Sequence, residues 1–171
     1  MKRILFNLFL ICSFAGNTFA VCPVPSVVPV KEIENDIKEK LNGNSDKLLL
    51  KSTPTGFIIS VEQNMMFDNN NCLSCEGCEI LNFMAEIMKT SGRRWHIFCH
   101  DDSPNLYDAL VKTSYQASKI TDYLIDIERC LINQISPIGF GSMMPYKNFE
   151  VKDGNTNNRI DFIVEDFSFN R

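Results

Sequence analysis

The sequence predicts an α+β domain, in which two helices pack on one face of a mixed β-sheet. Three observations lead to this fold class. Apolar residues alternate in several short runs, as in half-buried strands, and recur every three or four positions in two longer runs, as in amphipathic helices. These patterns follow one another in the order strand, helix, strand, helix, strand, strand. A chain of 171 residues, 44% hydrophobic and 22% charged, can bury one core of its own.

The chain opens with a segment typical of a signal peptide. Lys2 and Arg3 precede an apolar run over residues 4–14, and the small residues before Val21 suit cleavage by signal peptidase. The run is too short to remain as a membrane span. We therefore expect residues 1–20 to be removed and the protein to be exported.

Two forms of the exported chain agree with the sequence. Residues 19–22, Phe-Ala-Val-Cys, loosely resemble the lipobox that precedes a lipidated cysteine, so Cys22 is a lipidation candidate and simple secretion is the alternative. Residues 21–47 then form a proline-containing leader and a short amphipathic helix, and residues 48–171 form the domain.

The charge of the mature chain argues against nucleic acid as a partner. Cleavage removes Lys2 and Arg3 and no acid, which leaves 15 basic and 21 acidic residues and a formal net charge of about −6. Nucleic acids and anionic lipid surfaces both bind basic proteins. The sequence therefore favours other partners.

The individual elements follow from apolar spacing, taken in chain order. Residues 30–41 have the pattern of the short amphipathic helix, and Asn42-Gly43-Asn44 ends it. Residues 48–50 and 57–61 predict two strands around a turn.

Two longer helices and three more strands complete the domain. Ser74 is expected to cap the first long helix, which ends at Gly92, and Ser103-Pro104-Asn105 offers caps for the second. Alternation predicts strands over residues 95–100, 135–140 and 160–164. The helical stripes are Ile80, Leu81, Met84, Ile87 and Met88 in the first helix, and Leu106, Leu110, Ala117, Ile120, Leu124 and Ile127 in the second.

Polar chemistry gathers where the strand of residues 95–100 ends. His100, Asp101 and Asp102 follow a buried run directly, so they can meet a ligand without being desolvated by the core. No nucleophile stands at a recognisable spacing from a base, and no glycine-rich phosphate loop occurs. The sequence therefore predicts neither an enzyme nor a cofactor, and His96 and His100 are expected to be structural.

Six short motifs occur in order along the chain: Phe67-Asp68, Leu73-Ser74-Cys75-Glu76-Gly77, Cys99-His100-Asp101-Asp102, Lys112-Thr113-Ser114-Tyr115-Gln116-Ala117, residues 135–145 and residues 157–161. Together they resemble the OmpA-like (OmpA/MotB C-terminal) peptidoglycan-binding domain family over roughly residues 48–165. The third motif stands for the family's Gly-His-Thr-Asp, and the fourth for its Leu-Ser-x-x-Arg-Ala. The resemblance implies a βαβαββ domain with both helices on one face.

The resemblance also implies a pocket for the diaminopimelate of the peptidoglycan stem peptide. In the family an Asp, here Asp102, holds the ammonium group, and an Arg holds the carboxylate. Gln116 occupies the position of that arginine. The other residues implied for this site are Phe67, Asp68, His100, Asn105, Lys119 and Arg159.

Gln116 is the main departure from the family. Loss of a bidentate guanidinium from a partly buried charge pair should cost a few kcal/mol of binding free energy. The Gln116 amide can still donate, and Lys112 or Lys119, one turn to either side, could bring a charge into reach. We therefore expect weakened or altered binding. Asp102 also has a plainer interpretation, as a cap at the entry of the second helix.

The cysteines allow two interpretations. In a reducing cell Cys72, Cys75 and Cys78 with Cys99 and His100 would suggest zinc, whereas disulfides are expected in an exported protein. If the strands on either side of the first long helix are parallel, Cys99 lies at the same sheet edge as the other three. We therefore predict a disulfide from Cys99 to one of them, and no metal. Cys130 belongs at the opposite edge.

Two functions follow from the resemblance. One is a non-enzymatic cell-envelope protein that anchors an outer-membrane or periplasmic component to peptidoglycan, located in the periplasm or on the periplasmic face of the outer membrane. The alternative is a structural subunit of an outer-membrane secretion-system core, similar to the DotK/IcmN-like lipoproteins of type IVB systems, with weakened or lost wall binding. A stator-type motor protein would need a permanent membrane helix and ranks last. The expected partners are peptidoglycan and outer-membrane or secretion-complex proteins, with membrane attachment through Cys22 if it is lipidated.

Overall fold

The computed structural model describes residues 27–41, 48–144 and 157–165. The signal peptide expected over residues 1–20 and the lipidation candidate Cys22 lie outside this part of the chain. Among the described residues, no helix has the length and apolar character needed to cross a membrane.

Five strands form one mixed sheet at the positions that apolar alternation predicts: β1 (Leu48–Thr53), β2 (Gly56–Glu62), β3 (Trp95–His100), β4 (Ile135–Gly141) and β5 (Arg159–Glu165). This is one strand more than the βαβαββ order contains, because β1 and β2 form an antiparallel pair ahead of the first long helix. Their order across the sheet is β1-β2-β5-β3-β4. β5 is antiparallel to both β2 and β3, whereas β3 and β4 are parallel. β2 and β3 therefore run in the same direction, and their carboxyl ends lie at the same edge of the sheet.

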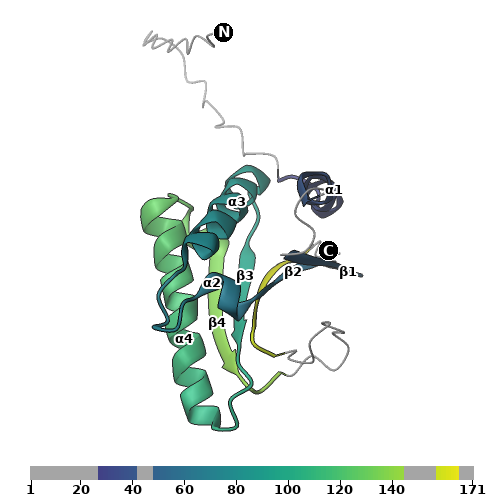
Figure 1. Ribbon diagram of the computed structural model, residues 1–171. Helices are drawn as coiled ribbons and strands as arrows, with labels where there is room; N and C mark the ends of the chain where they lie inside the picture. The colour runs from purple at the N-terminus through teal and green to yellow at the C-terminus, as the bar shows by residue number, and fades with distance from the viewer. Residues whose placement is uncertain (1–26, 42–47, 145–156, 166–171) are drawn as a thin grey trace, which may run out of the picture.

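Helices cover one face of this sheet. They are α1 (Val30–Leu41), α2 (Gln63–Met66), α3 (Cys75–Ser91) and α4 (Leu106–Asp122), followed by a π-helical turn, Tyr123–Ile127, and a short 3-10 turn, Ile132–Gln134. The two long helices, α3 and α4, lie side by side on the same face (Figure 1), which confirms the predicted α+β layers. The stripe expected to run to Ile127 as one helix instead changes to a π turn after α4.

The starts of both long helices have the predicted caps. The Ser74 hydroxyl accepts the backbone N–H of Gly77 at 2.8 Å, and Asn105 Oδ1 accepts the N–H of Tyr107 at 3.1 Å. α3 is followed by Gly92 in the left-handed conformation, with φ of 63°.

The core lies between the sheet and the helices. Along β3 the side chains alternate, so Trp95, Ile97 and Cys99 point toward the helices and are fully buried. α1 packs into the same core through Ile33 and Ile37. The short helix after the leader is therefore part of the folded unit.

One glycine fixes how closely α4 approaches the sheet. A Cβ atom at Gly139 of β4 would collide with the backbone of Thr113 and Ser114 in α4. Only a residue without a side chain permits this approach. The contact sets the depth at which α4 presents Lys112 and Gln116 to the sheet edge.

Candidate ligand-binding site

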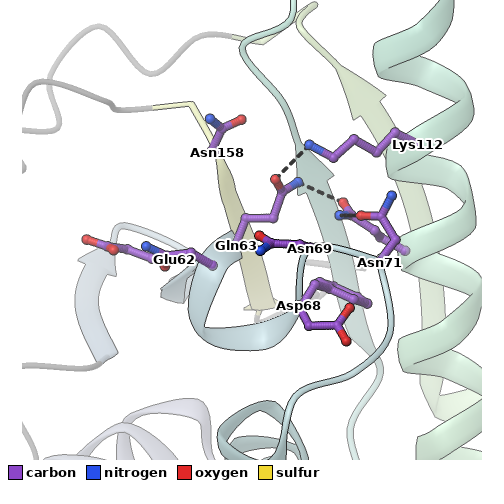
Figure 2. Close-up of a pocket in the computed structure, with 10 residues that line it drawn as sticks. Glu62, Gln63, Asp68, Asn69, Asn71, Lys112 and Asn158 are labelled. Carbon is purple, nitrogen blue, oxygen red and sulfur yellow. Dashed lines mark hydrogen bonds between the residues drawn. The ribbon is translucent and has the colours of Figure 1, made fainter.

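A pocket of about 500 Å³ opens at the sheet edge where β2 and β3 end. α2 and the loop after it form one side, and α4 forms the other (Figure 2). The lining is polar and consists of two acids, one lysine, six amides and one aromatic ring. These residues are Glu62, Gln63, Asn64, Phe67, Asp68, Asn69, Asn71, Lys112, Gln116 and Asn158.

A chain of hydrogen bonds crosses the pocket (Figure 2). Lys112 Nζ donates to Gln63 Oε1 at 2.9 Å. Gln63 Nε2 donates to Gln116 Oε1 at 2.8 Å. Gln116 Nε2 in turn donates to Asn71 Oδ1 at 3.1 Å. Because Lys112 also pairs with Asp101, one network joins α2, its following loop, α4 and the end of β3.

Gln116 occupies the position at which the resemblance places a cationic side chain for the ligand. Its side chain instead takes part in the chain of hydrogen bonds across the pocket. Its side chain is fully buried. Its oxygen and nitrogen are bonded to Gln63 and Asn71 respectively. Gln116 therefore holds the pocket wall together, and the positive charge has to come from elsewhere.

Lys112, and not Lys119, brings that charge to the pocket. An ammonium group has three N–H donors, and Asp101 and Gln63 accept two of them. The Lys112 side chain is 36% exposed, so its third donor can reach a ligand. Lys119 is not among the lining residues, and its ammonium lies 5.3 Å from the centre of the Tyr115 ring.

Of the two neighbouring acids, Asp101 is the one that joins this network. Asp101 is buried, its Oδ1 accepts the N–H of Ser103 at 2.7 Å, and its Oδ2 pairs with Lys112. Asp102, which the resemblance favours, is exposed and lies outside the lining; its backbone N–H donates to Asn158. Asp101 follows Cys99 by two residues, just past the end of β3, and its carboxylate meets Lys112 of α4 there.

Phe67 and Asp68, both predicted site residues, lie in the pocket. Phe67 is buried and forms an isolated bridge with Leu73. Asp68 is exposed, and its Oδ1 accepts the N–H groups of Asn70 and Cys72 at 2.8 and 2.9 Å. Asp68 therefore shapes the loop that carries the pocket wall. Asn105, by contrast, is occupied as the cap of α4 and is not a lining residue.

His100 and Arg159 belong to a second polar cluster, on the sheet face opposite the helices. Asp161 is its centre: Ser60 donates to it at 2.5 Å, Arg159 Nε at 3.0 Å, and His100 Nε2 lies 3.2 Å away. Neither ring nitrogen of His100 has a hydrogen bond of good geometry, and the ring stacks on Phe140. Burial raises the pKa of Asp161, but its contact with His100 and the Arg159 charge outweigh it and lower that pKa. These two predicted residues do not line the pocket.

The disulfide predicted from Cys99 is not formed. All five cysteines in the described part of the chain are free. Cys99 points into the core, whereas Cys72 and Cys75 are exposed at the start of α3. Burial, with the nearby charge of Asp161, raises the pKa of the Cys99 thiol. A shared sheet edge is therefore not sufficient for a disulfide, because Cys99 is buried in the core and Cys72 and Cys75 are exposed.

The sequence did not indicate most of the amides in the lining. Gln116 and Asn158 fall within the short motifs, whereas Gln63, Asn64, Asn69 and Asn71 lie outside them. Among the described residues, no group of three or more His, Cys, Asp or Glu side chains is arranged to hold a metal ion.

The fold is shared with several solved structures. A MotB-like protein from Desulfovibrio vulgaris superposes with a TM-score of 0.67 at 15% identity, covering 79% of this chain and 90% of that one. The cell wall anchor of the T6SS from Pseudomonas aeruginosa gives 0.57 at 11% identity, covering 82% and 97%. The OmpA-like domain of FopA1 from Francisella tularensis gives 0.52 at 13% identity, covering 68% and 78%. No protein-family model and no curated protein matches the sequence. The chain thus has the fold of MotB-like and OmpA-like domains.

Proposed function

We propose that this chain is a non-enzymatic cell-envelope protein that anchors an outer-membrane or periplasmic component to peptidoglycan through the diaminopimelate of the stem peptide. Two features support the proposal besides the sequence motifs. The chain shares its fold with a protein described as a cell wall anchor. Its pocket lies at the sheet edge that carries the family-like strand end and helix. Export directed by residues 1–20 is part of the same proposal.

The observation that carries the proposal is the pairing of opposite charges in one pocket. Lys112 offers an N–H donor for the carboxyl end of the ligand, and Asp68, whose Oδ1 accepts two loop N–H groups, offers its other carboxylate oxygen for the ammonium group. Glu62 adds a second negative charge to the lining, although Figure 2 shows its side chain directed away from Gln63 and Lys112. An amino-acid end needs both kinds of partner, because either charge alone is costly to desolvate. The role first given to Asp102 passes in this proposal to the acids of the lining.

Sedimentation of the mature chain with purified peptidoglycan tests the proposal. Binding should fall in Lys112→Ala and in Asp68→Ala. Binding should persist in Lys119→Ala and Asp102→Ala. These are the matched controls, because each removes the same kind of charged residue at a position outside the lining. Circular dichroism of each variant separates lost binding from lost folding. Equal losses in all four variants, or no binding by the folded parent protein, would contradict the proposal.

Two observations favour a second function, that of a structural subunit of an outer-membrane secretion core of the DotK/IcmN-like kind. Gln116 replaces the family arginine, and the charge of Lys112 is already paired with Asp101. Such a subunit would copurify with a large envelope complex and leave peptidoglycan unbound. Palmitate labelling of the parent protein and of Cys22→Ala tests whether Cys22 is the membrane tether.

A further inference from the structure

The balance of charge in the pocket points to a more specific ligand. We propose that the pocket binds a stem peptide whose diaminopimelate side-chain carboxyl group is amidated, so that the ligand carries an ammonium group and a carboxamide. This inference rests on the proposed function, because it names the form of the same ligand.

Formal charges at the pocket sum to a negative value. Glu62 and Asp68 are exposed acids of the lining (Figure 2). The positive charge of Lys112 is balanced by Asp101, with which it is in direct contact. Lys112 therefore still offers the ligand an N–H donor, which a carboxamide oxygen accepts as a carboxylate oxygen does, but no net charge. A free diaminopimelate end, with one ammonium and one carboxylate, is neutral and adds a carboxylate to this acidic site. The amidated end keeps the ammonium and is positive, so the field of the pocket favours it.

Hydrogen-bonding capacity points the same way. A carboxylate only accepts hydrogen bonds, and its best partner in proteins is a bidentate guanidinium. This pocket has an amide, Gln116, at the position of the family arginine. A carboxamide both donates and accepts, as Asn and Gln side chains do.

The pocket has amides available for such pairing. The exposed Asn64 and Asn69 side chains have no hydrogen bond within the described part of the chain. Asn158 Oδ1 accepts one backbone N–H, that of Asp102, at 3.0 Å. In the view of Figure 2, Asn158 lies above the Gln63 side chain and Asn69 below it, and both belong to the pocket lining.

Calorimetric titration with three synthetic stem tripeptides tests the inference on the mature protein. The peptides differ only in the third residue: diaminopimelate with a free side-chain carboxylate, the same residue as the carboxamide, and lysine, which lacks the group. The carboxamide peptide should bind about fivefold more tightly than the free acid, the size expected for one exposed charge interaction. The lysine peptide should bind more weakly than the carboxamide peptide.

Variants that remove a charge but keep nearly the shape of the original side chain provide a second test. Glu62→Gln combined with Asp68→Asn removes both acids of the lining, while Asn at position 68 can still accept the two loop N–H groups. The preference for the carboxamide peptide should then shrink to within about twofold. Asp102→Asn is the matched control, because it removes an exposed acid outside the lining.

The possible results separate a failure of the amidated-ligand inference from a failure of the proposed function. Equal or tighter binding of the free acid overturns the inference and leaves the proposed function in place. Equal binding of the lysine and carboxamide peptides overturns it as well, because the pocket would then not recognise the amide group. If the protein binds none of the three peptides and no intact peptidoglycan, the proposed function fails, and the inference fails with it.

Discussion

The ion pair between Asp101 and Lys112 fastens the end of β3 to α4, and its strength can be measured. The Asp101 side chain is 3% exposed and that of Lys112 is 36% exposed. Removing one partner of a buried pair costs about 3–5 kcal/mol of unfolding free energy, and an exposed pair contributes about 0–1 kcal/mol. When Lys112 is replaced, Asp101 still accepts the hydrogen bond from the Ser103 N–H. We therefore expect Lys112→Met to lower the unfolding free energy by about 2 kcal/mol.

A double-mutant cycle isolates the interaction from the rest of the side chain. Urea unfolding of the parent protein, Lys112→Met, Asp101→Asn and the double variant should give a coupling energy of about 1–2 kcal/mol. Lys119→Met is the control and should change stability by about 0.5 kcal/mol or less. Additive single effects would refute the reasoning. They would mean that the charge of Lys112 is free for a ligand carboxylate, which removes one support for an amidated ligand.

Three further predictions concern the rest of the fold. Gly139→Ala should destabilise the protein by about 2 kcal/mol or more because its Cβ meets the backbone of α4, whereas Gly92→Ala, left-handed but in open space, should cost about 1 kcal/mol; thermal unfolding compares them. Although burial raises the pKa of Asp161, its buried histidine and arginine partners hold it below the ordinary value. The carboxylate therefore contributes stability that is complete above about pH 5 and is lost progressively as the pH falls through the unfolded pKa of about 3.9 and then through the lower folded pKa. Unfolding free energies should depend less on pH in this range in Asp161→Asn than in the parent protein. A thiol reagent applied to the native protein should label Cys72 and leave Cys99 intact, as peptide mass spectrometry can show.

The sheet and the long helices were predictable because apolar spacing records which face of an element is buried. Ser74 and Asn105 are local signals, and both act as caps in the structure. α2 was missed, since Gln63–Met66 is a four-residue helix with no room for a periodic stripe. The π turn after α4 was missed for a different reason: its residues keep the apolar stripe and change only the backbone hydrogen bonding.

The sequence predicted where the candidate site lies but only some of the residues that line it. Motif order brought Phe67, Asp68 and Gln116 to one pocket. Gln63 could not be found from the sequence, because its partners Lys112 and Gln116 lie about fifty positions away and only the folded sheet edge brings them together.

One local arrangement accounts for three positions at which this chain departs from the OmpA-like motifs that it resembles. Just past the end of β3, an Asp at position 101 replaces the family Thr and pairs with Lys112 of α4. Cys99, in place of Gly, lies two residues earlier and fills the core. An arginine at position 116 would put a second cation one helical turn from Lys112 in a fully buried position, and like charges there oppose one another. Gln116 is thus the residue that suits a pocket already supplied with a lysine. The cost of an arginine at this position should therefore be smaller when position 112 is uncharged.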